Sequence, residues 1–354
     1  MIDTIKIALD VHPSVVGKDF CRNSAAVQHH HGGFTKVIIN NKGDEYLPRL
    51  TLFRRGNART LYVEFSAPKL LFGNNFEELA DTDFEPLLIA LQQKLATITN
   101  HTFTIDILRN APVSICHFSK NIIFRDYTSC STILDALSKQ DISRTYDIQI
   151  TKYRLGQSLQ IHANSVDISF YDKIAELGQA NKSPKRSIEP HALRQKALFE
   201  QLQLYKPFDV LRYEVRLVNR TKIKHLLPNL KVWNFESLFS SQISRKVLLQ
   251  YWDELNKHTD FLGLDILEPS EILQNYLTDT PDSTINEALK ATAGLLIIKQ
   301  TSHRQLQQLI TKKSGAHTWY RLKPLLKQPG KHRYKSFVAI SKQLDQFERI
   351  RMPP

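Results

Sequence analysis

The groups best suited to chemistry in this chain are a tyrosine and a lysine two residues apart, Tyr171 and Lys173, in the run VDISFYDKIAEL. A tyrosine hydroxyl can attack a phosphodiester and keep one strand end as a phosphotyrosine, which stores the cleaved bond. A free phenol has a pKa of about 10 and is a poor nucleophile unaided. A nearby lysine would favour the phenolate, and a divalent metal ion would polarise the phosphate. The pattern therefore predicts phosphoryl transfer through a tyrosine.

Charged and imidazole side chains recur on one face of the strands predicted around this tyrosine. Alternate side chains of a strand point to opposite faces, so VDISFY places Asp167, Ser169 and Tyr171 together. The runs LYVEF, SLQIHA and LRYEVRL divide in the same way. If the four strands join one sheet, its polar face collects Glu64, His162, Arg212, Glu214 and Arg216. An ordinary antiparallel sheet with one face in solvent would show the same alternation, so both interpretations stay open.

The elements that must position these groups follow an α+β pattern. Alternation predicts strands at 2–9, 35–41, 49–54, 60–66, 103–108, 112–118, 146–153, 158–163, 166–171 and 210–218. Apolar spacing and turn signals predict helices at 83–97, 131–138 and 186–206. Beyond Leu226 the pattern is helical almost throughout. We therefore expect two domains, 1–227 and 228–354, of which the second is mainly α-helical.

The positive charge is concentrated near the C-terminus. The 354 residues include 48 Lys and Arg against 35 Asp and Glu, a net charge of +13. The stretch 288–344 holds twelve basic residues and no acidic one. A local positive field attracts polyanions, and nucleic acid is the commonest of these in cytoplasm. We expect DNA as the partner rather than a basic surface kept only for solubility, because the basic residues are interleaved with a packable apolar pattern.

A helix, a glycine turn and a second helix are predicted within this basic stretch. The run SHRQ at 302–305 has the form of a capping box that opens a helix, and Gly315 would end it. A second helix would begin at Ala316, which completes the outline of a helix-turn-helix. Pro324 argues against a long second helix, because proline lacks a backbone donor. The candidate DNA contacts are Lys312, Lys313, Arg321 and Lys323.

Composition excludes several classes of protein. Apolar residues make up 42% of the chain, enough for a core, yet no apolar run approaches the roughly 20 residues that span a bilayer. The N-terminal run MIDTIKIALD lacks the basic and apolar regions of a signal peptide. Three cysteines are too few for a disulfide framework or a cysteine-rich zinc site. We expect a cytoplasmic protein with no membrane partner.

Four stretches carry the pattern of a known family. ISFYDKIAEL at 168–177 looks like a tyrosine motif, and VLRYEVRL at 210–217 looks like an arginine-aromatic-glutamate strand. MIDTIKIAL looks like the first strand, and LYVEFSAPKLLFGNN at 61–75 like a strand with an acidic residue followed by a lysine and a turn. Together they resemble the rolling-circle replication initiators, which include the phage II/X replication proteins of filamentous phages and related plasmid initiators.

The resemblance implies catalytic roles for the matching residues. Tyr171 would be the nucleophile and Lys173 its neighbour, while Glu214 and Arg216 would support the site. The implied fold is an N-terminal antiparallel sheet with helices on one face, as in rolling-circle nucleases, followed by the helical C-terminal domain.

The resemblance also implies a divalent metal ion, Mg²⁺ or Mn²⁺. Glu64 would bind it or lie beside it. His117 stands where the family has an acidic residue, and imidazole is a competent ligand for such an ion. Parity places His117 on the face of Val113 and Ile115, so a bulge or a strand end is needed there. The family's His-hydrophobe-His pair is missing, and His162 in the run QIH is the reserve ligand.

The activity implied is site-specific nicking of a double-stranded origin. Tyr171 would leave a 5′-phosphotyrosine and a free 3′-hydroxyl primer, and would later rejoin the displaced single strand. A helicase and a polymerase of the bacterial host are partners by analogy, and a homodimer stays open.

Two other functions remain open at this point. The first is a DNA-binding replication-control protein on the same scaffold that never forms a covalent adduct. The second is a tyrosine recombinase, which has an all-helical, metal-free catalytic core. The run HALR at 191–194 matches the recombinase His-x-x-Arg element, but Tyr213, which follows it, lies in a strand-like run.

Overall fold

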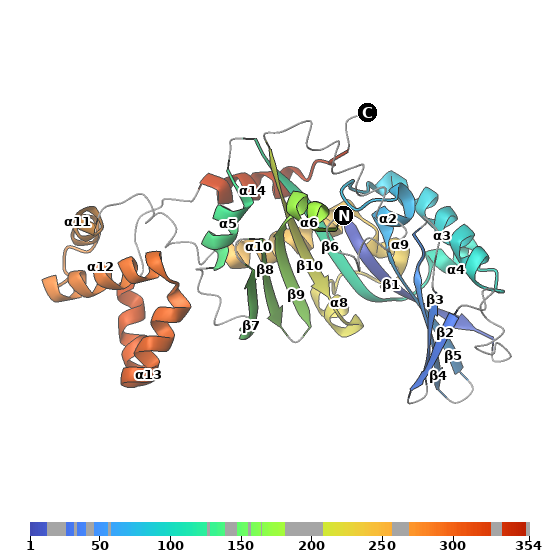
Figure 1. Cartoon of the computed structure of the whole chain (residues 1–354), viewed down its shortest axis with the longest axis horizontal. Helices are drawn as coiled ribbons and strands as arrows, with labels where there is room; N and C mark the ends of the chain where they lie inside the picture. The colour runs from blue at the N-terminus through green and yellow to red at the C-terminus, as the bar shows by residue number, and fades with distance from the viewer. Residues whose placement is uncertain are drawn as a thin grey trace. The chain divides into compact units, whose positions relative to one another are not determined.

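The structure of the protein is a computed structural model. It describes residues 1–12, 26–31, 34–39, 46–55, 58–125, 128–138, 147–154, 157–163, 165–180, 208–256, 269–326 and 335–351. The chain divides into two units, whose helices and strands are labelled in Figure 1. The first comprises Met1–Tyr127, Asn164–Leu248 and Phe347–Pro354, and the second comprises Thr128–Ala163 and Leu249–Gln346.

The first unit is built on an antiparallel sheet. Its neighbouring strands follow the order β2-β3-β4-β5-β1-β6-β10-β9, and each of these pairs is antiparallel. In chain order, the strands are β1 (Ile2–Val11), β2 (Ala26–His31), β3 (Phe34–Ile39), β4 (Arg49–Arg55), β5 (Ala58–Ser66), β6 (Val113–Phe124), β9 (Val166–Asp172) and β10 (Asp209–Leu217).

Helices pack against both faces of this sheet, whereas we expected them on one. In β10, Tyr213 donates a hydrogen bond to the carbonyl of Leu248 in the first turns of α10. Val210, which points to the opposite face, packs with Ile174 and Leu177 of α6. The helices of this part of the chain are α2 (Ala67–Phe72), η1 (Asp81–Asp83), α3 (Phe84–Ile98), α4 (Ile105–Arg109), α6 (Lys173–Ala180), α8 (Arg220–Leu226), α9 (Phe235–Leu238) and α10 (Ser241–Asn256).

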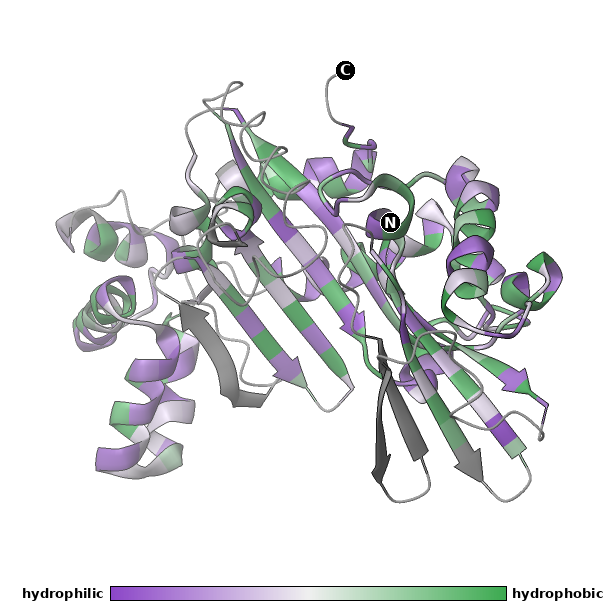
Figure 2. Cartoon of the chain, turned by 45° about the vertical axis from the view of Figure 1, so that its right-hand side comes forward, coloured by the Kyte–Doolittle hydropathy of each residue, from purple (hydrophilic) through white to green (hydrophobic). Residues whose placement is uncertain are grey.

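Strand alternation builds the core of the first unit. In β1, Ile5, Ile7 and Leu9 are buried, while the residues between them point to the polar face and are more exposed. The same alternation appears as hydrophobic and hydrophilic bands along the strands in Figure 2. Phe170 of β9 stacks on Tyr213 of β10 with ring centroids 4.6 Å apart, a spacing that suits offset aromatic stacking.

Two bulges change which side chains share a face. The pairing of β1 with β6 shifts between Lys6 and Ile7, so that Ser114 is an extra residue in β6. This supplies the bulge that the parity of His117 required, and His117 lies opposite Thr4 and Arg216. A second shift between Ile2 and Thr4 makes Asp3 the extra residue of β1.

The boundary expected after residue 227 lies inside the first unit, which continues to Leu248 and includes the residues from Phe347 onward. The physical reason is that the start of α10 packs beneath the sheet through the Tyr213 contact. The C-terminal part is helical as predicted: every described helix or strand after residue 228 is a helix.

The expected strands agree with the structure except at two places among the described residues. Where a strand was predicted at 103–108, residues 105–109 form the helix α4, because the Thr104 side chain caps it by accepting a hydrogen bond from the Ile107 amide. The strand β2, which contains His29–His31, was not predicted. The helix predicted at 186–206 lies outside the described residues.

The second unit contains a hairpin and several helices. Its elements are α5 (Cys130–Ser138), β7 (Asp147–Arg154), β8 (Ser158–Ala163), α11 (Pro269–Asp279), α12 (Ile285–Gln300), α13 (His303–Leu322), η3 (Lys323–Leu326) and α14 (Lys335–Gln346). The core between α11, α12 and α13 contains Leu295, Leu306 and Trp319. Among the described helices, none combines the length and the apolar character that crossing a membrane requires.

Candidate active site

Two adjacent strands bring the predicted nucleophile to a carboxylate. Tyr171 lies near the end of β9, beside the partner strand β10 that carries Glu214. The Tyr171 hydroxyl donates a 2.6 Å hydrogen bond to Oε1 of Glu214. Tyr171 is half-buried, on the polar face of the sheet. The sequence-predicted pair is therefore in direct contact.

Two arginines hold the Glu214 carboxylate. Arg216 binds Oε2 through Nε at 3.1 Å and Nη2 at 2.7 Å, and Arg212 Nε lies 3.4 Å from Oε1. Burial alone would raise the pKa of Glu214, but the charges of Arg216 and Arg212 and the Tyr171 hydrogen bond lower this pKa to about 2. Glu214 is therefore ionised at neutral pH.

The environment of Tyr171 keeps its phenol protonated in the resting protein. Burial, and after it the negative charge of Glu214, raise the pKa of Tyr171 well above 10, while the positive charge of Arg212 opposes this. The hydroxyl thus has a proton acceptor in place but is not ionised. Added positive charge near the phenol oxygen would lower this pKa.

Arg212 is the buried centre of the cluster. Its side chain is fully enclosed, and Nη2 donates to Oδ1 of Asp3 at 2.6 Å. Nη1 donates to the Asn121 side-chain oxygen at 2.9 Å. Burial opposes the charged guanidinium, yet Asp3, Tyr171 and Glu214 raise the pKa of Arg212 above its ordinary value. Arg212 therefore stays charged and has hydrogen-bond acceptors on several sides.

Lys173 is close to Tyr171 but is held by other partners. It begins α6 rather than extending β9, so its side chain does not follow the strand alternation that positions Tyr171. Its Nζ donates to Oδ1 of Asn75 at 2.9 Å and to Glu176 at 2.8 Å. The same Nζ lies 5.7 Å from the centroid of the Tyr171 ring, which is within reach of a cation–π interaction.

The expected metal ligands of the first unit lie on the same face of the sheet. Glu64 of β5 forms a 3.5 Å ion pair with Lys6 of β1 and is partly exposed. Burial, and then the charge of Arg216, lower the pKa of His117, whereas Asp3 and Glu214 oppose this. His117 is thus favoured as the neutral imidazole, whose lone pair can bind a metal ion. Carboxylates and a neutral imidazole are suitable donors for Mg²⁺ or Mn²⁺.

The three expected ligands do not form a ready ligand set. Among the described residues, the groups of three or more whose ligand atoms all lie within 4.8 Å of one another include neither Glu64, His117 nor His162. His162 lies in β8 and belongs to the second unit, whereas Tyr171 and Glu214 belong to the first. Glu64 and His117 remain candidates on the sheet of the first unit.

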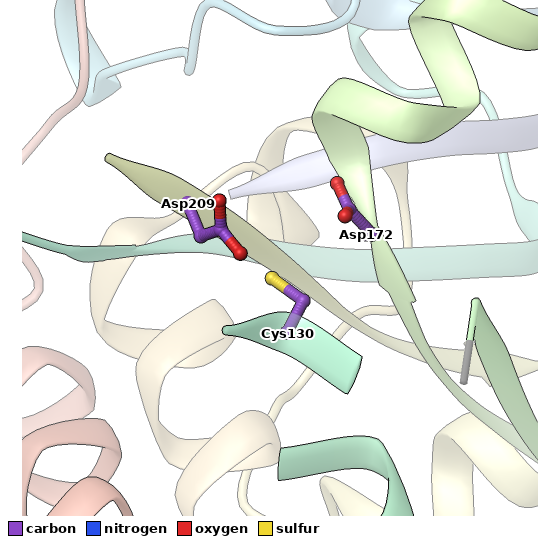
Figure 3. Close-up of side chains that lie close together, drawn as sticks. All are labelled: Cys130, Asp172 and Asp209. Atoms are coloured by element: carbon purple, nitrogen blue, oxygen red, sulfur yellow. The ribbon is translucent and has the colours of Figure 1, made fainter. Parts of the chain in front are cut away.

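Asp172 and Asp209 form a separate acidic pair. Asp172 ends β9 and Asp209 begins β10 (Figure 3), and their carboxylate oxygens lie within 4.8 Å of each other. Asp172 already accepts a 2.8 Å hydrogen bond from the Ala175 amide at the start of α6. Cys130, also drawn in Figure 3, belongs to the second unit, so we treat the two aspartates by themselves. Two acidic residues, one of which caps a helix, do not define a metal site.

The candidate DNA contacts lie in the second unit. Lys312, Lys313 and Arg321 of α13 are exposed, and Lys323 begins η3. The backbone of Gly315 leaves the helical conformation at φ 79°, so α13 consists of two helical halves joined at the predicted turn. The Ser302 side chain accepts from the Gln305 amide and caps the first half, as predicted. The second half ends at Leu322, just before Pro324.

The recombinase alternative is weakened by the position of Tyr213. This residue lies in the middle of β10, is buried, and donates its hydroxyl hydrogen to a backbone carbonyl. It is therefore held in the core on the face opposite Glu214. The run at 191–194 lies outside the described residues.

Sequence reasoning missed the residues that support Glu214 and Tyr171 from behind. Asp3 was hidden by the bulge at the start of β1, which places it beside Arg212 against simple alternation. Asn121 does follow the parity of His117 in β6, and that signal could have identified it. Asn75 lies in the turn after α2, where no strand or helix period predicts its direction.

Comparison with protein-family models, with curated proteins and with solved structures gives no match to this chain.

Proposed function

We propose that this protein is a metal-dependent enzyme that nicks and rejoins DNA at a rolling-circle origin, with Tyr171 as its nucleophile. The observation that carries the proposal is the 2.6 Å hydrogen bond from the Tyr171 hydroxyl to the ionised Glu214, on the polar face of an antiparallel sheet. A phenol beside an aligned carboxylate has a proton acceptor within reach, which a tyrosine nucleophile requires. The four sequence stretches that resemble rolling-circle initiators include both residues.

The chemistry proposed is a transesterification that consumes no ATP. The Tyr171 oxygen forms a bond to the scissile phosphorus, and the bond from phosphorus to the 3′-oxygen breaks. The phenol proton passes to Glu214, and the departing 3′-oxygen takes up a proton from solvent. The products are a 5′-phosphotyrosine and a 3′-hydroxyl that primes synthesis. Attack of a 3′-hydroxyl on the phosphotyrosine reverses the step and rejoins a strand.

Positive charge around this pair would stabilise the transition state. Arg216 is one-third exposed and holds Glu214 by two hydrogen bonds, so it can reach a phosphate beside the carboxylate. Lys173 places a cation against the Tyr171 ring. A divalent metal ion, when bound, would supply further positive charge that polarises the phosphate and favours the phenolate. We assign Glu64 and His117 to hold this ion. The charge of Asp3 also acts on His117.

The basic second unit would recruit the DNA. Its exposed lysines and arginine on α13 suit contacts to phosphates. The sheet of the first unit would then act on one strand of the melted origin, in the arrangement that the family resemblance implies. A helicase and a polymerase of the host would extend the primer.

The test is a nicking assay with supercoiled origin DNA and Mg²⁺. Wild-type protein should give nicked DNA with protein covalently attached, and Tyr171→Phe should lose both products because no oxygen can attack phosphorus. Tyr62→Phe is the matched control, since Tyr62 lies on the same face and is also half-buried beside a lysine. It should nick at the wild-type rate.

The outcomes separate the competing functions. Nicking by Tyr171→Phe would refute the assignment of the nucleophile. DNA binding without any adduct from the wild-type protein would favour a replication-control protein without enzymatic activity. Adduct formation that persists in EDTA would remove the metal from the proposal.

A further inference from the structure

The last described residues of the chain are bound to the first unit. We call Phe347–Arg351 the return segment. The Glu78 amide donates to the Ile350 carbonyl at 3.1 Å, and the Ile350 amide donates to Oε2 of Glu78 at 3.1 Å. Arg349 donates from Nε to the Glu78 carbonyl at 2.6 Å and forms a 2.8 Å ion pair with Asp83. The return segment is therefore fastened to Glu78 through both backbone and side chain.

A strained backbone shows that this attachment is specific. Phe347 has φ 49°, in the left-handed region that a residue other than glycine rarely adopts. Such a conformation persists only where surrounding contacts fix it. Lys120 supplies two of them: its Nζ donates to the Glu348 carbonyl at 2.6 Å and lies 5.7 Å from the centroid of the Phe347 ring.

Glu78 also connects the return segment to strand β6. Its buried carboxylate forms an ion pair with Lys120, and its Oε1 accepts a 2.6 Å hydrogen bond from the Asn121 amide. The Asn121 side chain donates to the Phe76 carbonyl at 2.6 Å. One buried carboxylate thus binds the return segment and the backbone of β6 at the same time.

Asn121 faces the candidate active site. Its side-chain oxygen accepts the 2.9 Å hydrogen bond from Arg212, which in turn contacts Glu214, the partner of the Tyr171 hydroxyl. The hydrogen bonds therefore run without a break from the return segment through Glu78, Asn121, Arg212 and Glu214 to Tyr171. All five of these residues belong to the first unit.

We propose that the return segment is a positioning element of the active site. It fixes Glu78 against β6, and Asn121 then orients Arg212, which aligns Glu214 with the Tyr171 hydroxyl. Glu78, Asn121 and Arg212 are positioning residues because they act through Glu214. The inference rests on the proposed function for its catalytic meaning, while the alignment of Tyr171 can be measured without any activity.

The experiment uses the full chain with Arg349→Ala and, as matched control, Arg109→Ala. Arg109 also bridges acidic residues of the first unit, Glu85 and Glu236, but it does not contact the Glu78 connection. The kcat and KM for nicking are measured with origin DNA. In parallel, the ¹³Cζ resonance of labelled Tyr171 is followed, assigned by its loss in Tyr171→Phe.

Arg349→Ala should lower kcat at least about 10-fold with KM for DNA unchanged, because a displacement of about 1 Å at the reacting groups costs up to about 100-fold. The Tyr171 resonance should shift toward that of a phenol without a carboxylate partner. Arg109→Ala should change neither. Lys120→Arg, which keeps the cation, should retain wild-type kcat where Lys120→Gln loses it.

Equal kcat loss in Arg349→Ala and Arg109→Ala, with an unshifted Tyr171 resonance, would overturn the inference. If the wild-type protein forms no adduct, the proposed function fails, and the resonance alone decides the positioning role. A shift in Arg349→Ala would then still support it, and an unchanged resonance would reject it.

Discussion

At the scale of single residues, the Tyr171–Glu214 pair keeps the shared proton on the Tyr171 oxygen in the resting protein. The pKa of the phenol is raised and that of the carboxylate is lowered, so both groups stay in their unreacted forms at neutral pH. In the proposed enzyme, this arrangement would keep Tyr171 unreactive until positive charge reaches it. A tyrosine that ionised freely would be reactive in the absence of DNA.

The low pKa of Glu214 predicts a pH-dependent contribution to stability. The folded-state pKa is about 2 against an ordinary value of 4.5, so the stabilisation is present above pH 4.5 and is lost as the pH falls toward 2. Glu214→Gln should be destabilised by about 3 kcal/mol at pH 7, since it removes the buried anion that Arg216 and Arg212 both contact. Unfolding in urea is measured at pH values from 7 to 3. The difference in free energy of unfolding between the wild type and Glu214→Gln should become smaller below pH 4.5.

Glu236→Gln is the control for this experiment, because the Glu236 carboxylate is half exposed in its ion pair with Arg109. An exposed pair contributes about 0–1 kcal/mol. A loss of stability in Glu214→Gln that does not depend on pH would contradict the assignment of an ionised, arginine-bound carboxylate.

The sequence predicted the residues of this site that obey strand alternation. Tyr171, Glu214 and Arg216 lie on the polar face because β9 and β10 are regular. Asp3 could not be predicted, because a bulge one residue long reverses the face of every side chain before it. Lys173 would share this face only if β9 continued, but the Asp172 side chain caps α6 there and turns the chain into a helix.

At the scale of elements, α13 illustrates how a glycine defines two helices. Gly315 has φ 79° and ψ 165°, which side chains with a Cβ rarely adopt. The two halves of α13 pack through Leu306 and Trp319 into one core. The sequence predicted this turn because glycine at the end of a helix is a strong local signal.

Gly315→Ala should destabilise the second unit by about 1–2 kcal/mol. A Cβ at Gly315 would meet nothing within 4 Å, so the loss would come from the backbone conformation and not from a clash. Ser314→Ala, at an exposed neighbouring position, should be nearly neutral. Urea unfolding followed by tryptophan fluorescence measures both, and equal stability of the two variants would exclude a required positive φ at Gly315.

The strand predicted at 103–108 shows where alternation misleads. Residues 103–108 satisfy a strand pattern, yet Thr104 caps residues 105–109 as a short helix. Arg109, at the end of this helix, bridges Glu85 of α3 and Glu236 of α9. These ion pairs connect residues far apart in the chain. Local pattern cannot anticipate them, so tertiary contacts decided this element.

At the scale of the whole molecule, charge and chemistry lie in different units. The described catalytic candidates Tyr171 and Glu214 belong to the first unit, and the basic helix α13 belongs to the second. In the proposed enzyme, the second unit would capture the DNA and the first would cleave it. Composition along the chain places the expected boundary at 227, whereas the first unit continues to Leu248 and also includes Phe347.

Removal of two lysines from α13 should reduce the salt dependence of DNA binding. In Lys312→Ala/Lys313→Ala, the slope of log K against log salt concentration should fall by about 2, since each phosphate contact contributes roughly 1. Lys290→Ala/Lys342→Ala removes the same charge from exposed positions on α12 and α14 and should leave the slope unchanged. Identical slopes for the two double variants would place the contacts elsewhere.

The first unit is assembled from three separated stretches of chain, and this determines when it can mature during synthesis. Strands β1, β5 and β6 leave the ribosome long before β9 and β10, and Phe347–Arg351 emerge only after the whole second unit. A nascent chain arrested before residue 347 would therefore lack part of the support of Glu214. Newly made protein would complete the hydrogen bonds that support Glu214 only after residues 347–351 have emerged.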